Sequence, residues 1–91
     1  MTSRKFGCDT IYYRKGFVEI TPGIHGNCVN LECWQIHNDL DISGMDLLDQ
    51  RISDESITAN VELELSLETA EALVVALQDA IYAVRASGNV S

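Results

Sequence analysis

The sequence has little basic charge, a single proline and no long apolar run. Six Lys and Arg residues stand against 14 Asp and Glu residues in 91, which gives a formal net charge of −8. Contacts to phosphates need clustered Lys and Arg side chains, and an anionic membrane surface repels a chain of the same sign. No segment approaches the ~18 apolar residues of a membrane span. The sequence therefore predicts neither direct nucleic-acid binding nor membrane binding.

Motifs for catalysis are also missing. Neither His25 nor His37 stands in a pattern that supplies a nucleophile and a base, and there is no G-x-S-x-G, phosphate-binding glycine loop or H-E-x-x-H. Glu62 and Glu64 are two positions apart on a predicted strand, about 6.6–7 Å by strand rise, which is a spacing that paired-carboxylate hydrolases also use. An exposed strand offers no enclosure that would shift the pKa of one of them. We predict a protein that is not an enzyme and carries no cofactor.

The N-terminus and the cysteines favour a cytoplasmic protein. Arg4 and Lys5 are followed by no apolar stretch, so the first residues do not resemble a signal peptide. Three cysteines, an odd number, indicate reduced thiols and not a disulfide framework. We expect Cys8, Cys28 and Cys33 to act mostly as small apolar side chains.

Two metal sites are weakly suggested by spacing. His25, Cys28, Cys33 and His37 are zinc-compatible residue types. Cys28 and Cys33 are separated by an odd number of positions in a predicted strand, however, so their side chains should point to opposite faces. Core cysteines and solvated histidines are the preferred interpretation.

The second weak metal signal resembles the start of a calcium loop. Asp39, Asp41 and Ser43 place oxygens at alternate positions before a glycine, as an EF-hand loop does. Asp46 then stands where that loop is apolar, and Gln50 stands where it has a bidentate glutamate. Turn-capping by Asp39 and Ser43 is the preferred role.

The C-terminal part gives the clearest structural pattern. Apolar and polar residues alternate strictly over 57–67, which predicts a strand with one buried and one solvated face. The pattern then changes to a helical stripe, and we predict a helix over 67–86 with Ser66 as N-cap and Gly88 as stop signal. The stripe consists of Ala70, Leu73, Val74, Leu77, Ala80, Ile81 and Val84.

The N-terminal part predicts three more strands. Residues 11–14 and 17–20 flank Lys15-Gly16, so a tight hairpin turn is expected there; a three-residue Arg-Lys-Gly loop with a bulge is the competing register. A third strand is predicted over 28–36, followed by a long acidic connection over 37–56.

These patterns predict one α+β domain: a small antiparallel sheet of about four strands in β-β-β-β-α order, with the C-terminal amphipathic helix packed on one face. The predicted division of 1–91 is an N-terminal arm 1–9, a three-strand meander 10–36, an acidic connection 37–56, a strand 57–66, a helix 67–86 and a tail 87–91.

Charge distribution leads to the predicted function. Residues 1–38 carry a balance of +1, and residues 39–91 carry −9. Such a field attracts a basic surface, so the leading hypothesis is a small inhibitor or adaptor that docks on a basic, nucleic-acid-binding surface of a larger host protein. Phage anti-defence proteins, anti-CRISPR proteins among them, are similar in kind, although no residues match. The acidic candidates for partner binding are Asp39, Asp41, Asp46, Asp49, Asp54, Glu55, Glu62 and Glu64.

An aromatic surface supports the alternative function. Tyr12, Phe17 and Trp34 are predicted on the sheet face that the helix leaves open. Three aromatic side chains on an open face are typical of a partner or dimer surface. The alternative is therefore a homo-oligomeric structural or assembly protein, with a homodimer as the simplest form.

Overall fold

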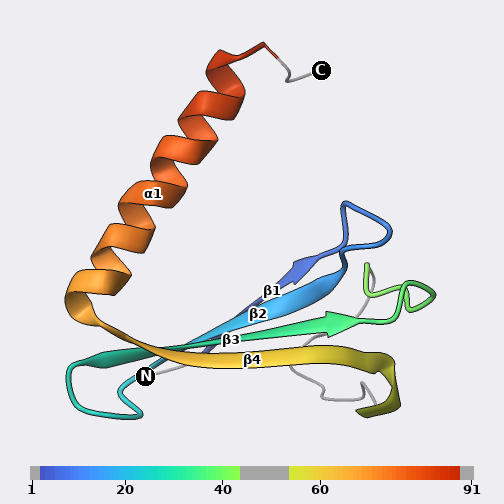
Figure 1. Cartoon of the computed structure of the whole chain (residues 1–91), viewed down its shortest axis with the longest axis horizontal. Coiled ribbons are helices and arrows are strands. Elements are labelled where there is room, and N and C mark those ends of the chain that lie inside the picture. The colour runs from blue at the N-terminus through green and yellow to red at the C-terminus, as the bar shows by residue number, and fades with distance from the viewer. Residues whose placement is uncertain (1–2, 44–53, 89–91) are drawn as a thin grey trace.

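The computed structural model describes residues 3–43 and 54–88 of the chain. Four antiparallel strands, β1 (Arg4–Cys8), β2 (Gly16–Pro22), β3 (Cys28–Ile36) and β4 (Ile57–Ser66), form one open sheet in the order β1-β2-β3-β4. A 3-10 turn (Asp54–Ser56) precedes β4, and helix α1 (Leu67–Ala86) follows it directly (Figure 1). This is the predicted α+β order of a four-strand antiparallel sheet and one C-terminal helix. No described helix is both long enough and apolar enough to cross a membrane.

The predictions for β3, β4 and α1 are confirmed. Ser66 caps the helix, since its Oγ accepts a hydrogen bond from the Thr69 N–H at 3.1 Å. Gly88 has φ +76°, the left-handed conformation that glycine adopts most readily after a helix. Local signals were sufficient here because caps and periodicity agree over many residues.

The predicted first hairpin is wrong. β2 pairs with Arg4–Cys8 and not with residues 11–14, so the segment predicted as an N-terminal arm contains a strand of the sheet. Residues 9–15 instead connect the two strands, with a turn closed by the Arg14 N–H and the Ile11 carbonyl at 3.0 Å. Both segments have strand-forming residues, and pairing to 4–8 supplies a strand whose side chains continue the pattern of β2 across the sheet.

The sheet separates side chains by chemistry. Residues that are opposite each other on neighbouring strands share a face, and the registers of all three strand pairs place the apolar residues together. The apolar face, as we name it, consists of Phe6, Cys8, Val18, Ile20, Val29, Leu31, Cys33, Ala59, Val61, Leu63 and Leu65, with Arg4, Gly16, Pro22 and Gln35 at its margins. The polar face consists of Lys5, Gly7, Phe17, Glu19, Thr21, Cys28, Asn30, Glu32, Trp34, Asn60, Glu62, Glu64 and Ser66.

The small core lies at one end of the polar face. Phe17, Ile36 and Ile42 are its buried apolar residues among those described, and Trp34 and Leu40 pack against them. The rings of Phe17 and Trp34 stack with centroids 4.7 Å apart. The segment after β3 thus returns over this end of the sheet and covers the aromatic pair.

Helix α1 does not cover the sheet, and this part of the predicted architecture is wrong. None of its described residues is buried, and it diverges from the strands beyond its first turns (Figure 1). The physical reason is the connection: Ser66 is both the last strand residue and the N-cap, so no loop residue remains to turn the helix back. Connections between a strand and a helix that packs on the same sheet commonly have two to six residues.

Candidate binding surfaces

The apolar face of the sheet is uncovered in the described part of the chain. Phe6, Val61 and Leu63 are about half exposed, with Leu63 at 54%, and no residue of this face is buried except Gly16 at its margin. A continuous apolar patch on four strands is unusual for a protein surface, and patches of this kind are typical of association sites.

The apolar stripe of α1 is equally uncovered. Leu77 is 55% exposed and Ile81 is 49% exposed. Val75 and Tyr82, on the opposite side of the helix, are exposed as well, so α1 is apolar around much of its circumference. A helix of this kind is normally buried on more than one side.

The size of the exposed surface can be compared with that of a compact chain. The accessible surface is 6999 Å², whereas a compact monomer of the same mass exposes about 5,200 Å². The radius of gyration is 15.0 Å, against about 12 Å for a compact chain of this length. The excess of about 1,800 Å² per chain is of the size that one subunit of an obligate homodimer buries, since such interfaces bury roughly 2,000–5,000 Å² over both chains.

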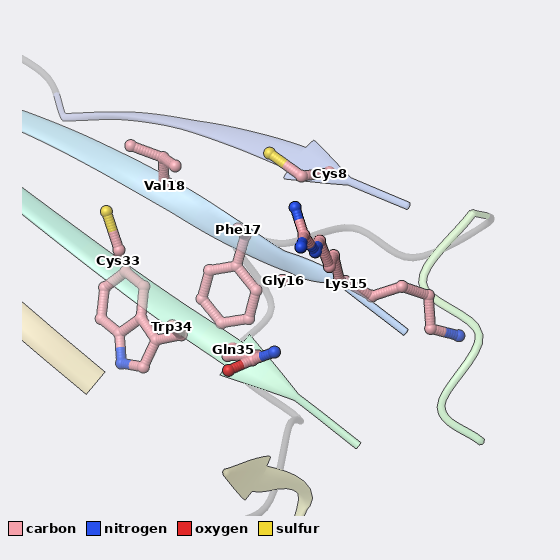
Figure 2. A pocket seen from close by; sticks show the side chains of 9 residues that line it. Cys8, Lys15, Gly16, Phe17, Val18, Cys33, Trp34 and Gln35 are labelled. Carbon is pink, nitrogen blue, oxygen red and sulfur yellow. The ribbon is translucent and has the colours of Figure 1, made fainter. Parts of the chain in front are cut away.

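A shallow hollow of about 400 Å³ extends the apolar face at the Gly16 end of β2 (Figure 2). Cys8, Val18 and Cys33 line it from three neighbouring strands, and Arg14 and Lys15 stand at its rim. No carboxylate or histidine is among the lining residues, so the hollow holds no acid–base pair. It offers thiols and aliphatic groups bordered by positive charge.

The polar face brings carboxylates together from three strands. Glu19, Glu32 and Glu62 lie opposite one another in one cross-strand row, and Lys5 of β1 extends this row next to Glu19. Like charges in directly opposed positions are destabilising by a fraction of 1 kcal/mol, roughly 0.2–1 kcal/mol per pair. Asn60 partly offsets this by donating to Glu32 Oε2 at 3.1 Å.

Glu64, in the next row of the polar face, has its own partner. Its carboxylate pairs with His25 Nδ1 from the β2–β3 connection. Asn30 lies opposite Glu64 in the register and is 95% buried, the one buried polar side chain among the described residues.

The predicted acidic residues that the structure describes come from separate parts of the fold. Glu62 and Glu64 lie on the polar face of β4, whereas Asp39 and Asp41 lie in the segment after β3. Glu55 is exposed in the 3-10 turn that begins at Asp54. Asp46 and Asp49 lie outside the described residues. Glu19 and Glu32, which sequence reasoning left out, are the residues that join Glu62. Only the strand register could have shown this, because they come from three separate segments.

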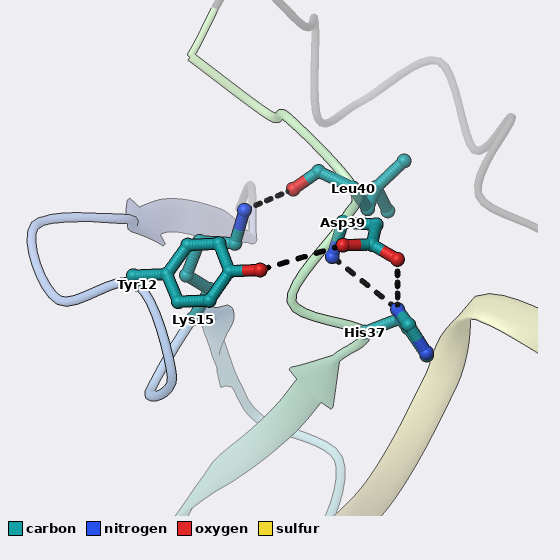
Figure 3. Close-up of polar contacts among 5 residues, drawn as sticks. All are labelled: Tyr12, Lys15, His37, Asp39 and Leu40. Carbon is teal, nitrogen blue, oxygen red and sulfur yellow. Dashed lines mark hydrogen bonds and ion pairs between the residues drawn. The ribbon is translucent and has the colours of Figure 1, made fainter.

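The predicted aromatic surface does not form. Phe17 is 95% buried and stacks on Trp34. The Nζ of Lys5 lies 5.4 Å from both ring centroids, within the range of a cation–π interaction. Tyr12 lies apart in the β1–β2 connection, where its hydroxyl donates to Asp39 Oδ1 at 3.4 Å (Figure 3).

The histidine and aspartates after β3 have local partners. The Asp39 N–H donates to His37 Nδ1 at 3.3 Å, and the Nζ of Lys15 donates to the Leu40 carbonyl (Figure 3). Ser43 donates twice to Asp41 Oδ1, from Oγ at 2.7 Å and from N–H at 2.9 Å. The Ser43 hydroxyl first, and its N–H second, hold the pKa of Asp41 below its ordinary value.

The two weak metal interpretations gain no geometric support in the part of the chain that is described. No group of three or more His, Cys, Asp and Glu side chains there could hold a metal ion. Cys28 and Cys33 lie on opposite faces of β3, as their spacing predicts. In the predicted calcium loop, the Ser43 hydroxyl instead donates a hydrogen bond to Asp41 Oδ1 within a turn.

Comparison with protein-family models, with curated proteins and with solved structures gives no match to this chain.

Proposed function

We propose that this chain is a non-enzymatic assembly protein that works as a homo-oligomer, with the homodimer as its basic unit. The observation that carries the proposal is the pair of uncovered apolar surfaces, the apolar face of the sheet and the stripe of α1, on one small chain. Burying them would remove apolar area from water at about 25 cal/mol per Å².

Charge supports contact through these surfaces. The apolar face contains no Asp or Glu, and neither does the stripe of α1. Two copies with net charge −8 repel each other wherever their acidic surfaces meet. Association through the apolar surfaces keeps the carboxylates of both copies in water.

Sedimentation equilibrium of matched variants tests self-association. Leu77→Glu places a charge in the stripe, and Gln78→Glu places the same charge on the adjacent residue outside it. Both positions are exposed helix sites, so neither change disturbs the core around Phe17. We expect a dimer for the parent and Gln78→Glu, and a monomer for Leu77→Glu at the same concentration. A parent chain that stays monomeric at high micromolar concentration would refute the proposal.

A second function is favoured by the row of carboxylates on the polar face. Glu19, Glu32 and Glu62 repel one another in the free chain, and a partner's Lys or Arg side chains would relieve that repulsion. This supports the inhibitor or adaptor that docks on a basic surface of a larger protein, in the manner of the phage anti-defence proteins. The two functions are compatible because they use opposite faces of the sheet.

Docking on a basic partner is tested by affinity capture from a host lysate, with washes at low and high salt. Captured basic proteins should be lost at high salt and lost with the double variant Glu62→Lys/Glu64→Lys. The double variant Glu71→Lys/Asp79→Lys, which makes the same charge change on α1, is the control and should retain them. Equal capture by the double variant would exclude the polar face as the docking surface.

A further inference from the structure

The strand-to-helix corner fixes where α1 can go. Ser66 has φ −61° and ψ 162°, extended values, and the next residue is already helical. The side chain of Ser66 accepts a hydrogen bond from the Thr69 N–H, which holds Ser66 in this extended conformation. Helix α1 therefore leaves the sheet directly at the end of β4, with its first turn capped by the residue that ends the strand.

An exchange of helices between two copies brings both kinds of apolar surface into contact. Packing of two sheets through their apolar faces would leave both helices exposed. Pairing of two helices alone would leave both sheets exposed. When α1 of each copy lies on the apolar face of the other, the stripe of each helix and the β3–β4 half of each apolar face are covered together.

The dimensions of the elements agree with this exchange. A helix of 20 residues is about 30 Å long, and a strand of 10 residues is about 33 Å long. A helix about 10 Å across covers two strands at a spacing of about 4.8 Å. The stripe of α1 thus matches the apolar parts of β3 and β4, which include Leu31, Cys33, Val61 and Leu63.

The apolar side chains on the back of α1 also have a place in such a dimer. Val75 and Tyr82 lie opposite the stripe and are exposed in the single chain. Packing of the two helices of an exchanged pair against each other would cover this side as well.

We propose that two copies of this chain exchange their C-terminal helices, so that the α1 stripe of each copy packs on the apolar face of the other copy's sheet. This inference rests on the proposed self-association and adds which surface meets which. The partner is a second copy because the exposed area per chain, the absence of acids from both surfaces and the matching lengths are all met by this chain itself.

Cross-linking between two differently tagged, co-expressed copies tests the exchange. One copy keeps Cys33 on the apolar face and has Cys8 and Cys28 replaced by Ser. The other has all three natural cysteines replaced and carries a single new cysteine, Leu73→Cys or Leu77→Cys in the stripe. Asp79→Cys, on the opposite side of the helix, is the control. The doubly purified pair is treated with a short bismaleimide.

Exchange predicts a cross-linked heterodimer with the stripe cysteines and little or none with Asp79→Cys. A pair that co-purifies but gives no stripe cross-link would overturn the exchange and leave self-association standing. Failure of the two tags to co-purify would refute self-association itself. In a further variant, one chain carries both Cys33 and Leu77→Cys, and we expect no cross-link between these two cysteines of the same chain. A cross-link within one monomer would show that the helix folds onto its own sheet.

Discussion

At the scale of single residues, Gly16 is the position where the sheet tolerates a side chain least. A Cβ placed there would lie 1.9 Å from the Trp34 carbonyl oxygen, which belongs to the backbone of β3 and cannot rotate away. The backbone of Gly16 also begins β2 beside the stacked Phe17 and Trp34. The glycine is required by close approach and not by an unusual φ.

We therefore expect Gly16→Ala to lower the free energy of unfolding by about 1–3 kcal/mol or more, since β2 and β3 must move apart. Gly26→Ala is the matched control, because a Cβ at Gly26 meets nothing within 4 Å. Urea unfolding followed by Trp34 fluorescence measures both. Equal stability of the two variants would contradict the close approach of β2 to β3 at this position.

Asp41 is the second residue with a specific physical role. Its pKa is lowered in the folded chain, first by the Ser43 hydroxyl and then by the Ser43 N–H. A carboxyl group whose pKa is lower in the folded chain stabilises its turn at pH values above its ordinary, unfolded-state pKa. This contribution is lost as the pH falls through the lower pKa of the folded state.

Replacing Ser43 by Ala should raise the pKa of Asp41 toward its ordinary value, because the larger of the two contributions is removed. Carboxyl carbon NMR titration of the parent and Ser43→Ala measures this directly. Thr58→Ala, which removes a hydroxyl remote from Asp41, should leave the titration unchanged. An unshifted Asp41 in Ser43→Ala would show that its hydroxyl bond does not persist in solution.

At the scale of secondary-structure elements, the sequence predicted what is local and failed where pairing is distant. The strict alternation of β4 and the capped stripe of α1 define these elements within 10 and 20 residues. The partner of β2 could not be chosen this way, because segments 4–8 and 11–14 both suit a strand. The core residue Ile42 lies in a loop that packs against Phe17. The periodicity of the sequence gives no indication of this contact.

The candidate sites divide in the same manner. Glu62 and Glu64 were found because alternation shows which face of β4 they occupy. Glu19 and Glu32 were missed because only the registers bring them beside Glu62. The helix was expected to cover the sheet because an apolar stripe must be buried, and that premise still holds if a second copy supplies the cover.

The cap at Ser66 leads to a prediction for α1. Ser66→Ala removes the acceptor for the Thr69 N–H and should destabilise the helix by about 0.5–2 kcal/mol. Ser66→Asp keeps an acceptor and adds favourable charge at the helix N-terminus, so it should retain the parent's stability. Far-UV circular dichroism during thermal unfolding distinguishes them. Identical melting of Ser66→Ala and the parent would contradict a stabilising cap.

At the scale of the whole molecule, apolar and charged groups are sorted onto opposite sides of one sheet. The apolar face and α1 favour association with a like surface, and the polar face with its carboxylates favours a surface of opposite charge. Salt affects these two kinds of contact in opposite directions, because it screens repulsion between copies and also screens attraction to a cationic partner.

Raising the NaCl concentration from about 0.05 M to 0.5 M shortens the Debye length about threefold, to roughly 4 Å. We expect the dimer dissociation constant to fall, because two chains of charge −8 repel less. Analytical ultracentrifugation across this range measures it. Uncharged glucose at equal osmolarity is the control and should have little effect. A dimer that weakens with salt would show that charge pairs and not apolar surfaces hold it.

The corner at Ser66 also means that a small rotation at one residue displaces the far end of α1 by a large distance. The direction of α1 relative to the sheet depends on the two backbone angles of this residue, because the helix follows it directly. A rotation of about 10° there would displace the far end of a helix about 30 Å long by roughly 5 Å. In an exchanged pair, α1 of each copy contacts the sheet of the other. A small change in the twist of β4 in one copy would therefore displace the end of α1 against the other copy's sheet by a large distance.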